Sequence, residues 1–543
     1  MLRYFLLFSI LFIGLINVRA MWLAQVGPKY PPTKGEVWPK PQVEVKEQTF
    51  YVFNPSQFKV KVLDQTCDIL TNAIARYSYL LENKLGLKTH PTAPSPQTEG
   101  IHSNTSYRGH LKELEVTLTS PCEEYPHLDM DESYNLTVSS TTTLVSSSVW
   151  GVIRGLETFA QLFYVSDDHN DIRVNKTTIS DFPRYKHRGL LLDTSRHFIT
   201  VSNILKTLDA MAINKMNVFH WHIVDDQSFP YQSERFPELS ERGAFDPSMV
   251  YTKDDIERVI EYARNRGIRV IPEFDVPGHT GSWGIAFTDI LTECYENGKV
   301  IGFGPMDPTS NTTYKLLRDL FKEVQNVFPD KYFHVGGDEV ELQCWKSNPK
   351  LIDYMKVHKL TASDLHALFM SRVIPLLANA TVPVVWQEVY DEGVILSTDT
   401  LIQVWKYNWI TEMINVLKTG HRVLFSSSWY LDALGSRWTD YYAADPRQMV
   451  YDVTSNKTLM AGIVGGEACM WGEMADDRNV INRVWPRASA VAERLWSYQD
   501  SNTRYRSSRA PSEAYNRIEE HACRMIRRGI DAQPPSGPGF CVV

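Results

Sequence analysis

The sequence lacks the short motifs that mark several common enzyme classes. It has no Gly-x-Ser-x-Gly nucleophile elbow, no phosphate-binding P-loop and no His-Glu-x-x-His motif, which argues against an elbow-type serine hydrolase, a P-loop nucleotide enzyme and a zincin. It also has no Cys-x-x-Cys pair and no Cys/His cluster at zinc spacing. We therefore predict no metal site and no organic cofactor.

Runs of Lys or Arg are also missing. The formal net charge is −8 over 543 residues, so the sequence predicts neither a nucleic-acid partner nor a charged membrane surface. The hydrophobic fraction of 43% and charged fraction of 22% are typical of a soluble globular protein. This length suits two domains. The 14 Trp and 26 Tyr either pack cores or stack on the apolar faces of sugars.

Long apolar runs occur only at the N-terminus. Arg3 precedes an apolar run over residues 5–16, and Val18-Arg19-Ala20 fits a small-residue cleavage site, so residues 1–20 are predicted to be a cleaved signal peptide. The alternative is a membrane anchor, but the run is shorter than the roughly 20 residues that a span needs. We therefore expect entry into the secretory route and no membrane span.

Sequons and cysteines agree with that route. Seven cysteines are present, and in an oxidising compartment most of them should pair and leave one thiol free. Pairing in chain order would leave Cys469 as a buried thiol in an apolar stretch. The pairs would be Cys67 with Cys122, Cys294 with Cys344, and Cys523 with Cys541. The predicted glycosylation sites are Asn104, Asn135, Asn175, Asn311, Asn379 and Asn456.

The sequence changes character near residue 183. Before it, β-type runs at 49–53, 114–118 and 134–138 alternate with helical runs at 67–85 and 148–164. A polar stretch rich in Pro, Ser and Thr covers residues 90–109. These patterns predict a small α+β domain over residues 21–183, with an exposed loop.

From residue 184 to 543 a repeating βα pattern predicts the second domain. Helical patterns separate most of its strands; in residues 252–266, Thr252 can cap the helix and Gly267 ends it. Eight strands with intervening helices indicate a (β/α)8 TIM barrel, and a doubly wound sheet is the alternative. The predicted strands are 189–193, 217–224, 269–274, 332–335, 383–387, 401–405, 422–426 and 463–470.

Nearly every predicted barrel strand ends in polar or aromatic residues. In a barrel these ends meet at one mouth, where catalysis takes place. One acid there could equally cap a helix or form an ion pair, but neither role explains a set that includes Trp and His. Carboxyls for acid/base work and aromatic rings for a sugar suit a glycosidase. The set contains Asp193, Arg196, Asp225, Glu273, Asp275, His279, Asp338, Glu339, Trp386, Glu388, Trp405, Tyr430, Asp432, Trp471 and Glu473.

These strand ends carry motifs that resemble glycoside hydrolase family 20, most of all the β-subunit type of lysosomal β-hexosaminidase. The resemblance runs from about residue 35 to the C-terminus. It implies exo hydrolysis of terminal N-acetylglucosamine or N-acetylgalactosamine from glycoproteins, glycolipids, glycosaminoglycan ends or chitin oligosaccharides. It also implies that the protein forms a homodimer and that it is lysosomal or secreted. The motifs are RGLLLDTSRHF, NVFHWHIVDDQSFP, EFDVPGHT, HVGGDEV, WQEV, QVWK, WYLD and GGEACMWGE.

The family's mechanism assigns a role to each of the adjacent acids. The substrate's own 2-acetamido oxygen attacks the anomeric carbon and forms an oxazolinium-like intermediate. By resemblance, Glu339 is the general acid/base, and Asp338 orients the acetamido N–H. Tyr430 resembles the donor to the acetamido oxygen. Arg196 resembles the ligand of the ring hydroxyls.

The remaining assignments also follow from the resemblance. Asp225 and His279 resemble the polar residues that position the general acid. Glu473 and Asp432 resemble ligands of the outer hydroxyls. Where this chain has Asp432-Ala433, the α-type subunit of the family that it resembles carries Asn-Arg. Because a carboxylate repels a sulfate, we expect a preference for neutral substrates. Three tryptophans resemble the pocket walls and imply exo action: Trp386, Trp405 and Trp471.

Two other function classes stay open at this point. A catalytically inactive relative that only binds sugars should lose the acid/base pair, which this chain keeps. An ordinary retaining glycosidase with two catalytic carboxylates should tolerate loss of the substrate's 2-acetamido group.

Overall fold

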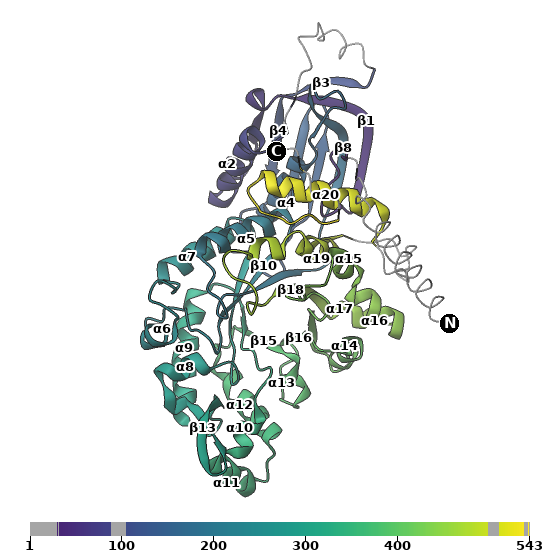
Figure 1. The fold of residues 1–543 in the computed structure, drawn as a ribbon. Helices are drawn as coiled ribbons and strands as arrows, with labels where there is room; N and C mark the ends of the chain where they lie inside the picture. Colours follow the sequence, from purple (N-terminus) through teal and green to yellow (C-terminus); the bar gives the residue numbers. More distant parts are fainter. Residues whose placement is uncertain are drawn as a thin grey trace, which may run out of the picture.

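The computed structural model describes residues 30, 32–87, 89, 105–497, 510–536 and 541. It has an N-terminal sheet domain and a barrel, with the last described helix lying between them (Figure 1). The predicted signal peptide, Asn104 and most of the predicted polar loop lie outside the described residues. Among the described residues, no helix is long and apolar enough to cross a bilayer.

The N-terminal domain is a mixed sheet with strand order β2-β4-β6-β5-β8-β1-β3, and β7 pairs with β8. Helices α2 (Asp68–Asn83) and α4 (Val149–Gln161) correspond to the two predicted helices. Residues 107–109, predicted as loop, belong to β3, and Tyr164, predicted as helical, belongs to β7. The strands are β1 (Val43–Phe53), β2 (Lys59–Val62), β3 (Tyr107–Leu111), β4 (Glu113–Leu118), β5 (Tyr134–Val138), β6 (Thr142–Ser146), β7 (Tyr164–Val165) and β8 (Ile172–Asp181).

The barrel is closed, with parallel strands in the order β10-β11-β14-β15-β16-β17-β18-β9. The predicted (β/α)8 fold is therefore confirmed, and the doubly wound alternative is wrong. The strands are β9 (His187–Asp193), β10 (Val218–Val224), β11 (Arg269–Phe274), β14 (Tyr332–His334), β15 (Val382–Trp386), β16 (Leu401–Val404), β17 (Arg422–Phe425) and β18 (Ile463–Met470).

Helices and one hairpin surround these strands. The hairpin β12 (Leu291–Glu296) and β13 (Lys299–Met306) projects from the loops after β11. The helices are α5 (Val201–Ile213), α6 (Glu238–Gly243), α7 (Lys253–Arg264), α8 (Gly281–Ala286), α9 (Asn311–Val327), α10 (Leu342–Ser347), α11 (Pro349–His358), α12 (Ala362–Val373), α13 (Gln387–Asp391), α14 (Trp409–Lys418), α15 (Trp438–Ala443), α16 (Pro446–Thr454), α17 (Lys457–Ala461), α18 (Val480–Val484), α19 (Arg487–Trp496) and α20 (Ser512–Arg527).

Helix α7 shows how local sequence sets these elements. The Thr252 side chain accepts a hydrogen bond from Asp255 N, and the Asp255 side chain accepts one from Thr252 N, which forms a capping box. The apolar face is buried, as predicted. Gly267, at φ +64°, turns the chain into β11 in a conformation that favours glycine.

The C-terminal helices join the barrel to the sheet domain. Trp496, at the end of α19, packs in the N-terminal core and donates its Nε1–H to Asp181 at 3.1 Å. Just after α20, Arg528 pairs with Glu157 of α4 at 2.8 Å. Because these contacts cross residue 183, the N-terminal domain and the barrel share buried surface. The division at residue 183 stays a prediction.

The three disulfides join the predicted pairs, Cys67–Cys122, Cys294–Cys344 and Cys523–Cys541. Cys469 is free and buried, as expected. Among the described sequons, the side chains of Asn135, Asn311, Asn379 and Asn456 belong to exposed residues. Asn175 is buried, and its Oδ1 accepts a hydrogen bond from Tyr164 at 2.5 Å. This burial argues against a glycan on Asn175.

Candidate active site

The loop after β14 places two adjacent acids in different environments. Its backbone turns through positive φ at Gly336 (+66°), Gly337 (+99°) and Glu339 (+48°). A Cβ on Gly336 would lie 1.7 Å from Asp275 Oδ1, so no larger residue fits there. The turn buries Asp338, which is 7% exposed, whereas the side chain of Glu339 is 59% exposed.

The Asp338 carboxylate lies at the bottom of the mouth. Its Oδ1 is buried and has no hydrogen-bond partner among the described residues. Burial, together with the Asp338 charge, raises the pKa of the adjacent Asp275 well above its ordinary value. The Asp275 Oδ1 accepts a hydrogen bond from Gly337 N at 2.8 Å. Asp275 belonged to the predicted strand-end set, but the sequence suggested no specific role for it.

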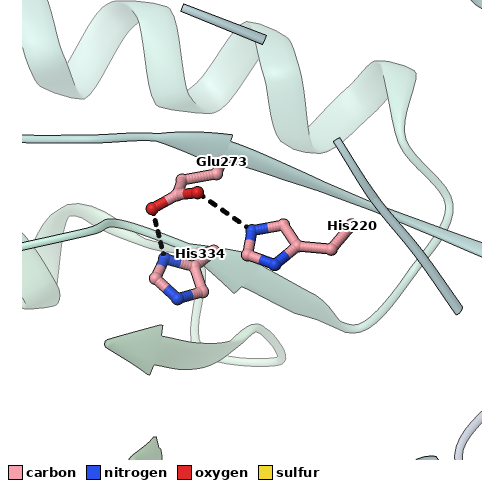
Figure 2. A group of neighbouring side chains, drawn as sticks. All are labelled: His220, Glu273 and His334. Atoms are coloured by element: carbon pink, nitrogen blue, oxygen red, sulfur yellow. Dashed lines mark ion pairs between the residues drawn. The ribbon is translucent and has the colours of Figure 1, made fainter. Parts of the chain in front are cut away.

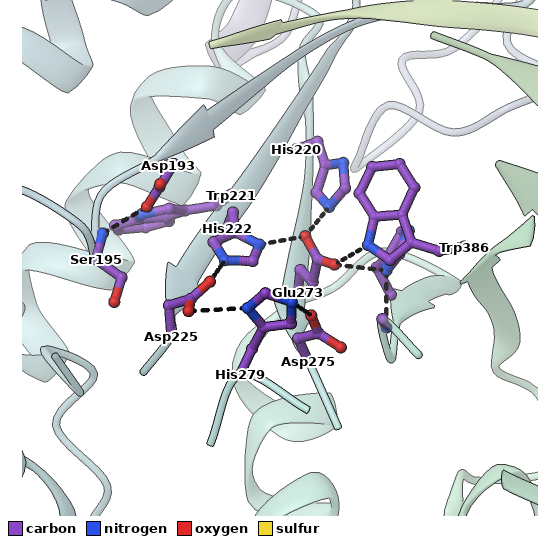
Figure 3. Close-up of polar contacts among 12 residues, drawn as sticks. Asp193, Ser195, His220, Trp221, His222, Asp225, Glu273, Asp275, His279 and Trp386 are labelled. Atoms are coloured by element: carbon purple, nitrogen blue, oxygen red, sulfur yellow. Dashed lines mark hydrogen bonds and ion pairs between the residues drawn. The ribbon is translucent and has the colours of Figure 1, made fainter. Parts of the chain in front are cut away.

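His279 lies between Asp225 and the two adjacent acids. Its Nδ1 is 3.1 Å from Asp225 Oδ1 (Figure 3). Its Nε2 is 3.8 Å from both Asp338 Oδ2 and Glu339 Oε2. Burial alone would lower the pKa of His279, but Asp275, Asp225 and Asp338 raise it to about 11. His279 is therefore an imidazolium with one N–H directed towards the mouth.

Arg196 is held in a fixed orientation beside this histidine. Its Nη1 donates to Asp193 Oδ2 and its Nη2 pairs with Asp225 Oδ2, each at 3.0 Å. Its guanidinium lies 5.1 Å from the centroid of the Trp471 ring, and Glu473 Oε1 is 3.7 Å from Nη1. Its Nε is buried with no partner in the described part of the chain. A cation fixed by two acids suits the binding of sugar hydroxyls.

Four aromatic rings form a closed cup at the mouth. Neighbouring ring centroids are 6.4 Å apart for Trp386 and Trp405, 6.1 Å for Trp405 and Tyr430, 6.4 Å for Tyr430 and Trp471, and 6.0 Å for Trp471 and Trp386. Cys469 is buried against the same cluster. A cup of this kind suits a small group with an apolar face.

Two further acids lie beside the cup. Asp432 has a buried Oδ1 with no partner among the described residues, and its pKa is raised by burial and by the charge of Glu473. Glu388 was in the predicted strand-end set without an assigned role. It accepts a hydrogen bond from Trp405 Nε1 at 2.9 Å and pairs with Lys406 at 2.7 Å. It therefore fixes one wall of the cup.

Beneath the mouth, histidines and carboxylates fill the barrel interior. Glu273 contacts His220 at 3.0 Å and His334 at 3.1 Å (Figure 2). These three residues also come within the range at which they could share a metal ion. Both contacts are ion-pair distances, and His220 Nε2 and His334 Nε2 are buried without a hydrogen-bond partner among the described residues. The sequence did not indicate this network, because its members lie inside apolar strand patterns.

Comparisons with known proteins agree with this geometry. The model of "Glycosyl hydrolase family 20, catalytic domain" matches residues 185–499, and "beta-acetyl hexosaminidase like" matches residues 37–162. Beta-hexosaminidase subunit beta of Felis catus is 44% identical over 97% of this chain and 98% of its own length. The human subunit beta is 48% identical over 79% of this chain and 76% of its own.

A solved structure extends the comparison to the fold. The chitobiase of Flavobacterium johnsoniae is 29% identical with a TM-score of 0.77, and the match covers 92% of this chain and 74% of that one. The catalytic-domain match covers more than half of the sequence and contains the whole aromatic cup. The chain belongs to glycosyl hydrolase family 20 and is a glycoside hydrolase of the β-hexosaminidase type.

Proposed function

We propose that the protein is an exo-acting β-N-acetylhexosaminidase that removes terminal N-acetylglucosamine or N-acetylgalactosamine by substrate-assisted, retaining catalysis. The observation that carries this proposal is the closed aromatic cup with Asp338 Oδ1 beside it, an atom with no hydrogen-bond partner among the described residues. An acetamido group in the cup would offer its methyl to the rings and its N–H to Asp338. The cup closes one side of the site, which suits a terminal sugar.

Three residues carry the chemistry in this proposal. Glu339 protonates the leaving oxygen as the acetamido oxygen attacks the anomeric carbon. Asp338 accepts the acetamido N–H and offsets the positive charge that develops on the ring formed. Tyr430 donates to the acetamido oxygen and aligns it for attack. Water then opens the oxazolinium ring, with Glu339 acting as general base.

The site surroundings support this division of roles. Glu339 is the more exposed acid and therefore faces the leaving group and water. Asp338 is buried, and its Oδ2 lies 3.8 Å from the Nε2 of His279. Arg196 and Glu473 lie on the side of the cup suited to sugar hydroxyls.

Acid mutants test the roles of the pair. On substrates with a poor leaving group, Glu339→Gln should lower kcat/KM by about 10²–10⁴-fold, whereas an activated aryl leaving group should restore most of it. Asp338→Asn should be impaired on both substrates. Near wild-type turnover by Asp338→Asn would contradict the assignment.

A comparison of substrates tests the mechanism. The enzyme should hydrolyse an aryl N-acetylglucosaminide and leave the matching glucoside almost untouched. Efficient glucoside hydrolysis would favour a glycosidase with an enzymic nucleophile. An inactive sugar-binding relative would turn over neither compound.

We also propose a preference for neutral substrates. Asp432 and Glu473 place two carboxyls at the rim, and Ala433 offers no cation there. An anionic 6-sulfate would be repelled by this pair. We expect lower kcat/KM on 6-sulfated than on plain N-acetylglucosaminide, and equal or faster turnover of the sulfated substrate would contradict this proposal.

The proposed setting is the lumen of the secretory pathway, a lysosome or the extracellular space, with glycan ends as substrates. Three disulfides support an oxidising compartment. The relatives named above are called subunits, which supports an oligomer, and we propose a homodimer. Light scattering coupled to gel filtration tests the dimer directly: a monomeric mass would contradict it.

A further inference from the structure

Buried imidazoles and carboxylates alternate along the barrel interior. Glu467 Oε1 contacts His187 Nε2 at 2.6 Å, and its Oε2 contacts His220 Nδ1 at 2.8 Å. His220 Nε2 lies 3.0 Å from Glu273 Oε2. Each of these side chains is at most 2% exposed. The strand register brings further histidines to Glu273. Glu273 of β11 is paired with His334 of β14 on one side and with His222 of β10 on the other.

The same series continues from Glu273 up to the mouth. Glu273 Oε2 contacts His222 Nδ1 at 2.6 Å, and His222 Nε2 contacts Asp225 Oδ2 at 2.7 Å (Figure 3). The other oxygen of Asp225 contacts His279 Nδ1 at 3.1 Å. The Nε2 of His279 then lies 3.8 Å from Glu339. Three consecutive links therefore join Glu273 to the imidazolium beside the proposed proton donor.

We propose that Glu273 is a positioning residue of the reaction, which acts on Glu339 through His222, Asp225 and His279. The inference rests on the proposed function of the site. Glu273 touches no reacting atom. Its part is to fix the orientation of the three side chains that place one N–H beside the proton donor.

The geometry of each link explains how the orientation is transmitted. His222 bridges two carboxylates through its two ring nitrogens, so its ring cannot turn without losing both contacts. Asp225 is held with Oδ2 on His222 and Arg196 and with Oδ1 on His279. His279 must then direct its remaining nitrogen to the mouth. Buried hydrogen-bonded residues behind a functional group commonly set its orientation in this way.

The charges along the series support the same arrangement. Burial opposes charge on His222, but Glu273 and Asp225 raise its pKa to about 10. The charged groups around His279 are Asp225, Asp275, Asp338, Glu339 and Arg196. The groups around Glu273 are His220, His222, His334, Glu467, Asp275 and Cys469. Cation and anion therefore alternate from Glu273 to the mouth.

A second contact of Glu273 offers a competing explanation. Its Oε1 accepts a hydrogen bond from Trp386 Nε1 at 2.7 Å, so loss of the carboxylate could disturb the wall of the cup instead. The two routes predict different kinetics. A misplaced proton donor slows substrates that need leaving-group protonation, whereas a displaced wall slows every substrate.

The test compares Glu273→Gln with the wild type on two N-acetylglucosaminides, one with a less activated methylumbelliferyl leaving group and one with a more activated dinitrophenyl group. The value of kcat/KM reports on the steps up to formation of the cyclised intermediate and not on its later hydrolysis. We expect Glu273→Gln to lower kcat/KM roughly 10–100-fold on the first substrate and less than about 3-fold on the second.

Glu467→Gln is the matched control. This buried carboxylate also bridges two histidines, but among the described residues it forms no hydrogen bond or ion pair with His222 or Trp386. Its ratio of the two kcat/KM values should equal that of the wild type. Thermal unfolding of each variant checks folding. If Glu273→Gln does not fold, His222→Gln interrupts the same series and should show the same selective loss.

An equal loss on both substrates, or no loss, would overturn the inference. The first result would assign Glu273 to the cup wall, and the second would make the contacts purely structural. Neither result touches the proposed function, which is tested separately by Glu339→Gln. If Glu339→Gln itself showed no dependence on the leaving group, the proposed function would fail first.

Discussion

The buried histidines make the stability of the barrel depend on pH in a direction that can be worked out. The pKa of His222 rises from its ordinary value of 6.5 to about 10 in the folded chain, because Glu273 and Asp225 outweigh the effect of burial. A raised folded pKa stabilises the fold fully below the unfolded value and loses that contribution as the pH rises through the folded value. Stability should therefore fall between about pH 6.5 and 10.

At acidic pH, the carboxylates make stability change with pH in the opposite direction. The histidine partners hold the pKa of Glu273, Glu467 and Asp225 below their ordinary values, against burial. Their contribution is complete above the ordinary values of 4.5 and 3.8, and it is lost as the pH falls through the lower folded values. Maximum stability is expected between about pH 4.5 and 6.5, where both sets are charged.

The size of the alkaline loss follows from the shift. One pKa unit corresponds to about 1.4 kcal/mol, so the His222 contribution is on the order of 5 kcal/mol. The carboxylates share this interaction, and it is counted once. An unfolding entropy of about 2 cal/mol/K per residue gives roughly 1 kcal/mol/K for a chain of about 500 residues. The melting temperature should therefore fall by about 5 °C from this group.

Thermal melts from pH 4 to 10 at constant ionic strength, for the wild type and His222→Gln, measure this directly. The variant should melt lower than the wild type near pH 6, and the two curves should converge as the pH rises to 10. Parallel curves across the whole range would refute the reasoning, because they would show that His222 does not carry the charge that the contacts predict.

Three other changes have defined outcomes. Arg196→Lys should lower kcat/KM by about 10–100-fold with an intact fold, since a point charge replaces a fork worth about 1.5–3 kcal/mol per charge-assisted bond; initial rates measure this, and a wild-type value would contradict it. Replacing Cys294 and Cys344 by Ser frees a loop with a sequence separation of 50 and should cost about 4 kcal/mol; denaturant unfolding measures this against the wild type. Gly337→Ala should cut turnover severely, because Gly337 has φ +99° and an added Cβ would lie 2.3 Å from Val389. Gly298→Ala is the control: Gly298 also has a positive φ but has open space around it, so this variant should keep its turnover and lose only stability.

The barrel and much of the mouth could be predicted because local patterns carry them. The strands are short apolar runs, and the residues that follow them must meet at one end of a closed barrel. The N-terminal sheet was harder: β8 (Ile172–Asp181) was missed because Thr and Ser alternate with its buried residues and resemble loop sequence. Its partners β1 and β5 lie far away in the sequence.

The interior network could not be predicted from sequence. His220 and His222 sit in a strand that is buried throughout and otherwise apolar, so the pattern correctly indicates burial but does not show what the side chains face. Glu467 reaches His187 and His220 only because the barrel closes between β18 and β9. Contacts of this kind depend on register between distant strands, which no local pattern encodes.

The contacts of the C-terminal helices also bear on the order in which the protein can fold. Glu157 is buried in α4 of the N-terminal domain, and its cationic partner Arg528 is made hundreds of residues later. The same domain receives Trp496 into its core from the end of the barrel. During synthesis, the first domain must therefore wait without the cation that pairs with Glu157 and with an incomplete core. We expect nascent chains that stop before α20 to be recognised by chaperones and to remain sensitive to proteases until the last segment has been translated.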